Sequence, residues 1–185
     1  YNKPGDVFLG IIHRIDRPVS GAIVFARTTK AVKRMNEIIK SRKMEKVYWA
    51  VVKELPPKTG DSLRGFLKKN EAKNKSFVYQ KQVSGSKEAA LDYRVIAHSS
   101  DYHLLEVHLK TGRHHQIRAQ LADIGSPIKG DIKYGFSRTN PNASIHLHAR
   151  KIEFIHPVRN TLLTIIADPP EDPLWNYFLE NQTGN

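Results

Sequence analysis

Hydrophobic residues along the chain change their spacing several times, and each spacing predicts a different element. Residues 21–26 form a short apolar run, which is typical of a buried strand. Apolar side chains then recur at helical spacing between residues 31 and 39, so we predict a helix that begins near Thr28 or Thr29. The other face of this helix is rich in Lys and Arg. That face fits a solvated surface and contact with a polyanion equally well.

Residues 46–52 are apolar or aromatic after Lys46 and predict a strand. Because successive side chains of a strand point to opposite faces, Val47, Trp49 and Val51 lie on one face, and Tyr48, Ala50 and Val52 lie on the other. Residues 56–75 then carry Gly, Asn and many lysines with little regular period. We interpret them as a long loop or a hairpin between strands, and as an arm that can touch a polyanion.

The second half of the chain alternates between strand and helix patterns. We predict paired strands at 91–97 and 102–109 around a turn at 99–101, a short helix at 115–124, strands at 145–154 and 162–166, and a terminal helix opened by Asp172 and Pro173 and packed through Leu174, Trp175, Phe178 and Leu179. The close strand pairs favour an α+β fold with a mixed, largely antiparallel central sheet and flanking helices. No repeat or linker is visible, so residues 1–185 are predicted to form one domain.

Composition adds a charge argument to this outline. Thirty Lys and Arg against eighteen Asp and Glu give a formal charge of +12, which indicates a polyanionic partner but does not separate RNA from DNA. The chain has no cysteine, which excludes disulfides and thiolate metal sites and fits a cytoplasmic location. No apolar run is long enough to span a bilayer, and the first five residues lack the pattern of a signal peptide. Because the chain starts at Tyr1 and not at methionine, we expect it to be a fragment.

The densest polar cluster inside an apolar neighbourhood covers residues 13–21. Asp16 lies there between Arg14 and Arg17, just before the predicted strand, and nearby positive charge favours the ionised carboxylate that an attacking or proton-accepting Asp needs. From the pattern alone, however, an Asp in such a turn is more often a turn former or a surface ion-pair partner. A second cluster, residues 111–118, places cations and amides at a strand-to-helix junction. It fits phosphate binding and a solvated helix start equally well.

The histidines raise the question of a metal site. His114 and His115 are adjacent, His146 and His148 share one face of a predicted strand, and His13 and His156 can be added to the set. Zinc needs three or four converging ligands, and the chain has no thiol, no HExxH pattern and no paired carboxylates near these histidines. We therefore expect no metal, and we interpret the histidines as core residues or as contacts to the polyanion.

Taken together and in order, four motifs resemble the RluA family of pseudouridine synthases. The motifs are His13-Arg14-Ile15-Asp16 with Ser20-Gly21, Lys46-Val47-Tyr48-Trp49-Ala50, Arg113-x-His115-Gln116-Ile117-Arg118 followed by Gly130-Asp131 and Tyr134-Gly135, and Leu147-His148-Ala149 with Phe154-x-His156-Pro157. The chain departs from the family pattern at Ile15, at His114 and at Ala119-Gln120. Members also usually carry an N-terminal strand and often a small RNA-binding domain ahead of the first motif. Either this member is short or, as we expect, an N-terminal segment is missing here.

The resemblance implies a cofactor-free enzyme that isomerises selected uridines of ribosomal RNA or tRNA in a cleft of the pseudouridine synthase fold. It implies Asp16 as the catalytic carboxylate, Tyr48 as a stacking and proton-transfer residue, and Arg118 as the cation that pairs with Asp16. For RNA contact we expect His13, Arg14, Arg113, His115, Gln116, Leu147 and His148. We also expect a monomer without a metal. The sequence leaves open whether Asp16 attacks the sugar, attacks the base or promotes an unsaturated sugar intermediate.

Two other classes compete with this reading. A non-catalytic RNA-binding or ribosome-assembly module would keep the fold and the basic surface, but it would need none of Asp16, Tyr48 and Arg118. A metal-dependent nuclease is a more distant alternative. If the chain is an enzyme of this kind, Asp16 and Arg118 should form an ion pair although they are about a hundred residues apart. A partly buried carboxylate needs a cation to stay charged. Tyr48 should open onto the cleft that contains this pair.

Overall fold

The computed structural model describes residues 7–181 of the chain. The strands are β1 Gly10–Ile11, β2 Ser20–Gly21, β3 Phe25–Ala26, β4 Met44–Val52, β5 Gly60–Asn70, β6 Lys75–Tyr79, β7 Lys87–His98, β8 His103–Leu109, β9 Leu147–Ile155 and β10 Leu162–Ile166. The helices are α1 Thr29–Lys40, α2 Gln116–Asp123, α3 Pro173–Glu180 and the short 3-10 helix η1 Ile132–Tyr134. The ends of the predicted domain, 1–6 and 182–185, lie outside the described residues, as does the segment considered as a signal peptide.

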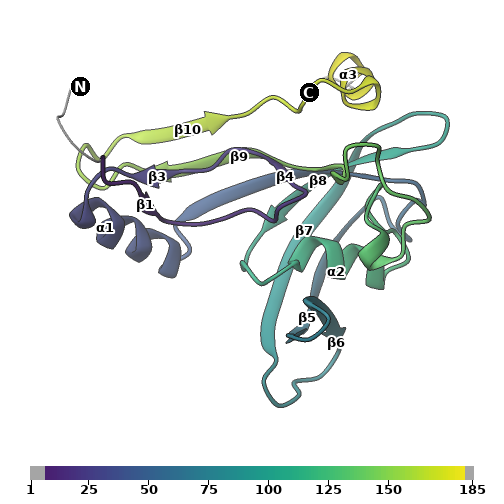
Figure 1. Cartoon of the computed structure of the whole chain (residues 1–185), viewed down its shortest axis with the longest axis horizontal. Coiled ribbons are helices and arrows are strands. Elements are labelled where there is room, and N and C mark those ends of the chain that lie inside the picture. Colours follow the sequence, from purple (N-terminus) through teal and green to yellow (C-terminus); the bar gives the residue numbers. More distant parts are fainter. Residues whose placement is uncertain (1–6, 182–185) are drawn as a thin grey trace.

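One large sheet organises the described part of the chain. Its strand order is β10-β9-β4-β8-β7-β5-β6, with antiparallel neighbours throughout, and β2 adds a short parallel pairing to β9. In Figure 1, β9 and β10 run across the view while β7, β5 and β6 descend from it, with α1 and α2 beneath and α3 above. The prediction of an α+β fold with a mixed, largely antiparallel central sheet and flanking helices is confirmed.

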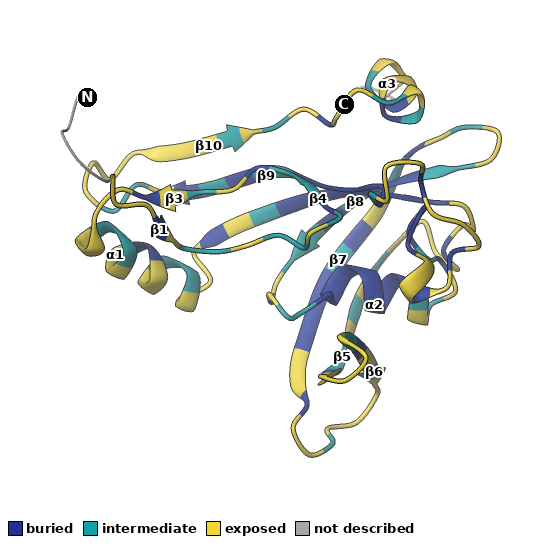
Figure 2. Ribbon diagram, viewed as in Figure 1, coloured by how far each residue is buried: buried dark blue, intermediate teal, exposed yellow. Residues whose placement is uncertain are grey.

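The central strand β4 is buried on both faces from Val47 to Val52. Tyr48 points into the larger apolar cluster, which also contains residues of β7, β8, β9 and α2. Trp49 and Val51 point the other way, into a cluster completed by Trp175 and Phe178 of α3. Figure 2 shows this burial as dark blue along the inner part of β4 and along α2. The two faces of one strand therefore separate the packing of α3 from the side that carries the polar clusters.

Helix α1 forms where the 3.6-residue period begins. Thr28 caps it by accepting the amide hydrogen of Ala31 at 3.1 Å, and Met35 is buried against β4 and β9. The terminal helix α3 is capped in the same way by Asp172, which accepts the amide hydrogens of Leu174 and Trp175. Both helices are confirmed, as is α2. None of the helices within residues 7–181 is long and apolar enough to cross a bilayer.

The predicted buried strand at 21–26 is wrong in two respects: the structure divides it into β2 and β3, and the side chains of Ile23 and Phe25 are exposed. Gly21 adopts a φ of 119°, which ends β2, and the amide of Val24 bonds to the ring of His13 instead of a strand partner. The lysine-rich segment 56–75 forms a hairpin, which was one of the two predicted alternatives. Strands β5 and β6 pair in antiparallel fashion, from Phe66 opposite Tyr79 to Asn70 opposite Lys75. The paired strands around the 99–101 turn and the two strands before α3 are confirmed.

Gly21 provides a test of how the polar loop is attached to the sheet. A Cβ atom there would lie 2.4 Å from the carbonyl oxygen of Ala149, and the φ of 119° is unfavourable for any residue but glycine. We therefore expect Gly21→Ala to lower the free energy of unfolding by about 1–3 kcal/mol in urea titrations followed by circular dichroism. Gly112→Ala is the control, because a Cβ at Gly112 has no atom within 4 Å. Equal stability of the two variants would contradict this attachment.

Candidate active site

The structure contains an open cleft of about 1150 Å³. Its walls come from the loop at 13–19, the first half of β4, the end of β8 with the loop that follows it, the start of α2, and β9. The first and third motifs of the sequence, 13–21 and 111–118, thus face one another across it. Asp16, Tyr48 and Arg118 all line this cleft.

Asp16 is held by one of its two carboxylate oxygens. Nη1 of Arg118 donates to Oδ2 at 3.2 Å, and Nε2 of His115 lies 3.6 Å from the same atom. Among residues 7–181, no group donates a hydrogen bond to Oδ1. The side chain is 23% exposed, so one oxygen is anchored while the carboxylate still faces the cleft. The predicted contact between Asp16 and Arg118 is confirmed.

Arg118 has a second and tighter carboxylate partner in Asp131. Its Nε and Nη2 donate to the two oxygens of Asp131 at 2.6 and 2.8 Å, which is the bidentate geometry of a strong arginine–carboxylate pair. The Asp131 side chain is 1% exposed and that of Arg118 is 5% exposed. Because the fork fixes the plane of the guanidinium, the remaining Nη1 is presented to Asp16.

The surroundings keep Arg118 charged despite its burial. Burial works against the cation, but the hydrogen bonds and charge of Asp131, followed by those of Asp16, outweigh it and raise the pKa of Arg118. The ring of Tyr134 adds a cation–π contact, with its centroid 5.1 Å from Cζ of the guanidinium. Arg118 is thus a permanent cation shared between one buried and one cleft-facing carboxylate.

His115 lies beside Asp16, and its hydrogen bonds define its tautomer. The amide of Ser76 donates to the hydroxyl of Tyr134 at 2.8 Å, which leaves the Tyr134 proton free to bond Nδ1 of His115 at 3.1 Å. The ring then carries its own proton on Nε2, the nitrogen that faces Asp16. Burial, followed by the charge of Arg118, lowers the pKa of His115 to about 3. His115 is therefore neutral near pH 7 and directs a proton toward Asp16 without adding a charge.

Tyr48 lies on the β4 wall of the cleft. It is 8% exposed, and its hydroxyl has no hydrogen-bond partner among the described residues. Burial and then the negative charge of Asp16 raise the pKa of Tyr48 to about 12. The phenol is therefore protonated near neutral pH, and its ring and hydroxyl are both available to a molecule in the cleft.

The loop that carries Asp16 is tied to β9. The imidazole of His148 bonds to the hydroxyl of Ser20 at 2.8 Å through Nδ1 and to the carbonyl of Ala167 at 2.9 Å through Nε2, and the ring is 1% exposed. Because Nε2 must donate to the carbonyl, Nδ1 accepts from Ser20. Both nitrogens are thus occupied inside the protein. The expected RNA contact is not available to His148, which supports the loop instead.

Gln116 also has a structural position that differs from the expected RNA contact. It is 3% exposed, accepts from the Thr111 hydroxyl and the Arg113 amide, and donates to the carbonyl of Ala90. These bonds shape the loop before α2. Gln116 nevertheless lines the cleft, as do the remaining residues expected to contact RNA, which are His13, Arg14, Arg113, His115 and Leu147.

The histidines considered as metal ligands are engaged in separate contacts. His146 bonds Asn140 and Asp172 and stacks on Trp175, whereas His114 bonds Ser76 and stacks on His115. Within residues 7–181, no group of three or more His, Cys, Asp or Glu side chains is arranged to hold a metal ion.

The sequence reasoning missed the roles of Asp131 and Tyr134. Both appeared only as landmarks of a motif, Gly130-Asp131 with Tyr134-Gly135. Gly130 and Gly135 were the residues in the sequence that could have pointed to these roles. Both adopt positive φ, and a Cβ at Gly130 would lie 2.8 Å from the Asn140 side chain. Two such turns around a polar residue indicate a constrained loop that aims a side chain inward.

Comparison with known proteins agrees with this geometry. A family model described as RNA pseudouridylate synthase matches residues 1–123. A relative from Chloroflexus aurantiacus, named "Uncharacterized RNA pseudouridine synthase", is 36% identical over 91% of this chain and 52% of its own length. Ribosomal large subunit pseudouridine synthase D from Xylella fastidiosa is 33% identical over 88% of this chain and 52% of its own. The chain thus spans about half the length of these curated relatives.

A solved structure titled Human RNA Pseudouridylate Synthase Domain Containing 4 superposes with a TM-score of 0.74 at 21% identity, covering 93% of this chain and 75% of that one. The fold is therefore that of the pseudouridine synthase class. The chain belongs to the RNA pseudouridylate synthase family and, within it, to the RluA type.

The Arg118–Asp131 fork is open to direct test. Asp131→Asn removes the charge that compensates a buried guanidinium, so we expect the free energy of unfolding to fall by on the order of 3 kcal/mol in urea titrations. Asp123→Asn, on the exposed end of α2, is the matched control and should change stability by less than about 0.5 kcal/mol. If Asp131→Asn were as stable as wild type, the fork would not be the support assigned to it here.

Proposed function

We propose that this chain is the catalytic domain of an RNA pseudouridine synthase with Asp16 as its catalytic residue. The observation that carries the proposal is the carboxylate of Asp16, anchored at Oδ2 by Arg118 and open at Oδ1, in a cleft onto which Tyr48 also opens. Such a charged, oriented and accessible carboxylate suits attack on carbon or removal of a proton. A module that only binds RNA has no need of it.

The reaction sets requirements that this cleft fits. The bond between the ribose C1′ and the uracil N1 breaks, C1′ rejoins the base at C5, and the proton on C5 is released while N1 gains one. The uridine has to leave its stack, which costs a few kcal/mol, and the detached base has to turn without escaping. Stacking on the ring of Tyr48 would offset about 1–3 kcal/mol of that cost.

Protons are handled by groups whose states are defined. Tyr48, with a pKa of about 12, enters the reaction protonated, so any proton that it takes from C5 has to be matched by release of its own to Asp16 or to water. Neutral His115 keeps a proton aimed at Oδ2 of Asp16. Both arrangements leave the negative charge next to Tyr48 and His115 on Asp16, where all three possible routes of the reaction need it.

The substrate is an RNA, for which the charge of +12 supplies general affinity. Arg14 and Arg113 line the cleft and are placed to contact phosphate or to fill the space of the flipped base. Ribosomal RNA is favoured by the similarity to a ribosomal large subunit enzyme, and tRNA is the alternative. The absence of cysteine suits the cytoplasm as its location, and we propose a monomer.

One assay distinguishes the proposed enzyme from its competitors. The chain is incubated with total cellular RNA in the presence of a chelator, and the RNA is analysed for new pseudouridine and for cleavage. Pseudouridine formation supports the proposal, whereas cleavage would indicate a nuclease. Tight binding with neither product would indicate a non-catalytic RNA-binding or ribosome-assembly module. Separate ribosomal RNA and tRNA fractions identify the substrate class.

Asp16→Asn keeps the side-chain volume but removes the charge. We expect it to reduce pseudouridine formation by more than about 1,000-fold with RNA affinity little changed, because the amide can neither attack nor accept a proton. Asp101→Asn in the exposed β7–β8 turn is the control and should retain full activity. Turnover by Asp16→Asn at the wild-type rate would overturn the assignment.

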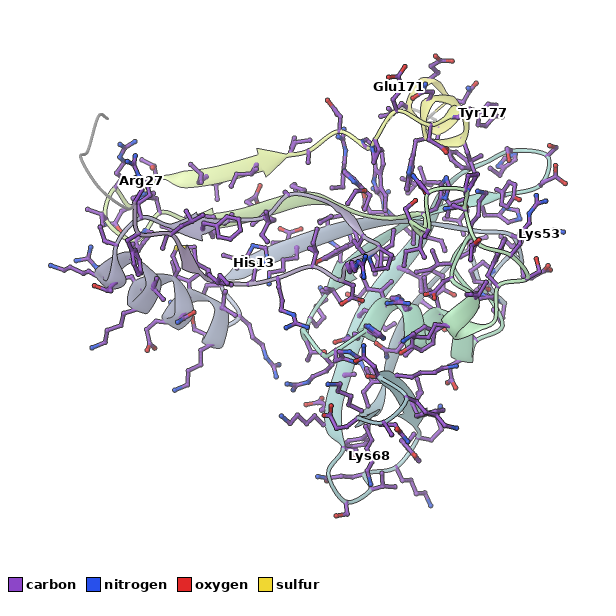
Figure 3. The ribbon with its side chains drawn as sticks, viewed as in Figure 1. His13, Arg27, Lys53, Lys68, Glu171 and Tyr177 are labelled. Atoms are coloured by element: carbon purple, nitrogen blue, oxygen red, sulfur yellow. The ribbon has the colours of Figure 1, made fainter. Side chains whose placement is uncertain are left out.

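Tyr48→Phe separates stacking from proton transfer. The phenyl ring keeps the stacking face, so we expect kcat to fall about 10- to 100-fold while the dissociation constant for RNA changes little. Tyr177→Phe on α3, on the far side of the sheet, serves as the matched control (Figure 3). An unchanged kcat in Tyr48→Phe would reduce Tyr48 to a stacking platform.

A further inference from the structure

Lys46 is a half-buried cation in the cleft without a partner. It lines the same cavity as Asp16 and lies two residues before Tyr48 on β4, so both side chains project from the same face of the strand, about 7 Å apart along it. No hydrogen bond, ion pair or aromatic contact to the Lys46 side chain is present within residues 7–181. Burial lowers the pKa of its amine. A cation in this position costs stability unless an anion compensates it.

His13 contributes a second unpaired donor at the same wall. Its Nε2 accepts the amide hydrogen of Val24 at 3.1 Å, so the proton of the neutral ring is on Nδ1. That buried Nδ1 has no hydrogen-bond partner. His13 and Lys46 line the same cleft, and burial followed by the positive charge of Lys46 lowers the pKa of His13 to about 4. Buried donors are normally satisfied, so the orphaned Nδ1 of His13 beside an unpaired cation points to a ligand.

We infer that Lys46, assisted by His13, binds a backbone phosphate of the RNA next to the uridine that stacks on Tyr48. This inference rests on the proposed function and adds a subsite to it. A phosphate oxygen would accept from both donors and would neutralise the amine. A uracil carbonyl would satisfy a hydrogen bond but leave a desolvated charge uncompensated, and for that reason we assign phosphate.

The position also suits the geometry of a flipped nucleotide. A base drawn into the cleft carries its own phosphates along the wall on which it stacks. Arg118 is fully occupied by Asp131 and Asp16 and cannot take such a phosphate. Lys46 is the cation of β4 that faces the cleft on the side of Tyr48, so it can hold the backbone in place while the base reorients.

The test measures how RNA binding depends on salt. Binding of a short oligouridylate is followed by fluorescence anisotropy between about 50 and about 200 mM KCl, and log affinity is plotted against log salt concentration. Lys46→Met should bind more weakly, and its slope should be smaller than that of wild type by about 0.7, the value of one contact to a single-strand phosphate. Lys46→Arg keeps the charge and should keep the slope.

Lys53→Met is the matched control. Lys53 lies just after the same strand but is exposed and does not line the cleft, and Figure 3 shows it at the right edge of the view, well apart from His13. It should leave both affinity and slope unchanged. Thermal melts of all variants show whether a loss of binding reflects a loss of folding.

A second measurement uses the unaltered chain, so it does not depend on any variant folding. Reductive methylation of lysines, read by mass spectrometry, should modify Lys46 more slowly when oligouridylate is bound and should modify Lys53 at the same rate with and without it. Equal modification of Lys46 in both states, or an unchanged salt slope in Lys46→Met, overturns the inference while the proposed function stands. If the wild-type chain binds no oligouridylate and forms no pseudouridine in cellular RNA, the proposed function fails as well.

Discussion

The site depends on one buried ion pair, the fork between Arg118 and Asp131. A guanidinium this deeply buried needs a carboxylate, and the bidentate contact both satisfies it and fixes its orientation. Only then does the third donor, Nη1, point at Asp16. The carboxylate that faces the cleft is therefore positioned from the interior of the protein, and α2 and the loop before η1 act as one support.

The local pattern was sufficient for most of the fold. The two-residue period of a strand assigned both faces of β4 correctly, and each face is covered by a different apolar cluster. Helical spacing located α1 and α3, each of which buries one stripe, and it also located α2, which is buried on nearly all sides. The division of the predicted strand at 21–26 escaped this reasoning. The apolar run does not show where a strand ends, because the break comes from the φ of Gly21 and from a bond between Val24 and His13. It does not report burial either, since Ile23 and Phe25 are exposed.

The site was less accessible to the sequence. Spacing alone favoured a turn role for Asp16, and its contact with Arg118 was expected only from the family resemblance. The Arg118–Asp131 pair joins α2 to a loop 13 residues further on, and the Ser20–His148 bond spans 128 residues. No local period encodes either pairing. For His148 the motif suggested a contact with RNA. Its position on β9 buries the ring, and both ring nitrogens bond to the protein, one of them to Ser20 at the end of the loop that carries Asp16.

A strongly basic chain faces a conflict when it has to keep one carboxylate reactive. Attraction of RNA requires many cations, yet cations in direct contact with Asp16 would hold both of its oxygens. The structure resolves this conflict by dividing the charges. His115 and His13 are buried and neutral, so they line the cleft as donors without charge. Arg118 shares its charge with Asp131, and Asp16 receives a single hydrogen bond from it. Exposed arginines and lysines are left to attract the RNA, while one oxygen of Asp16 remains free.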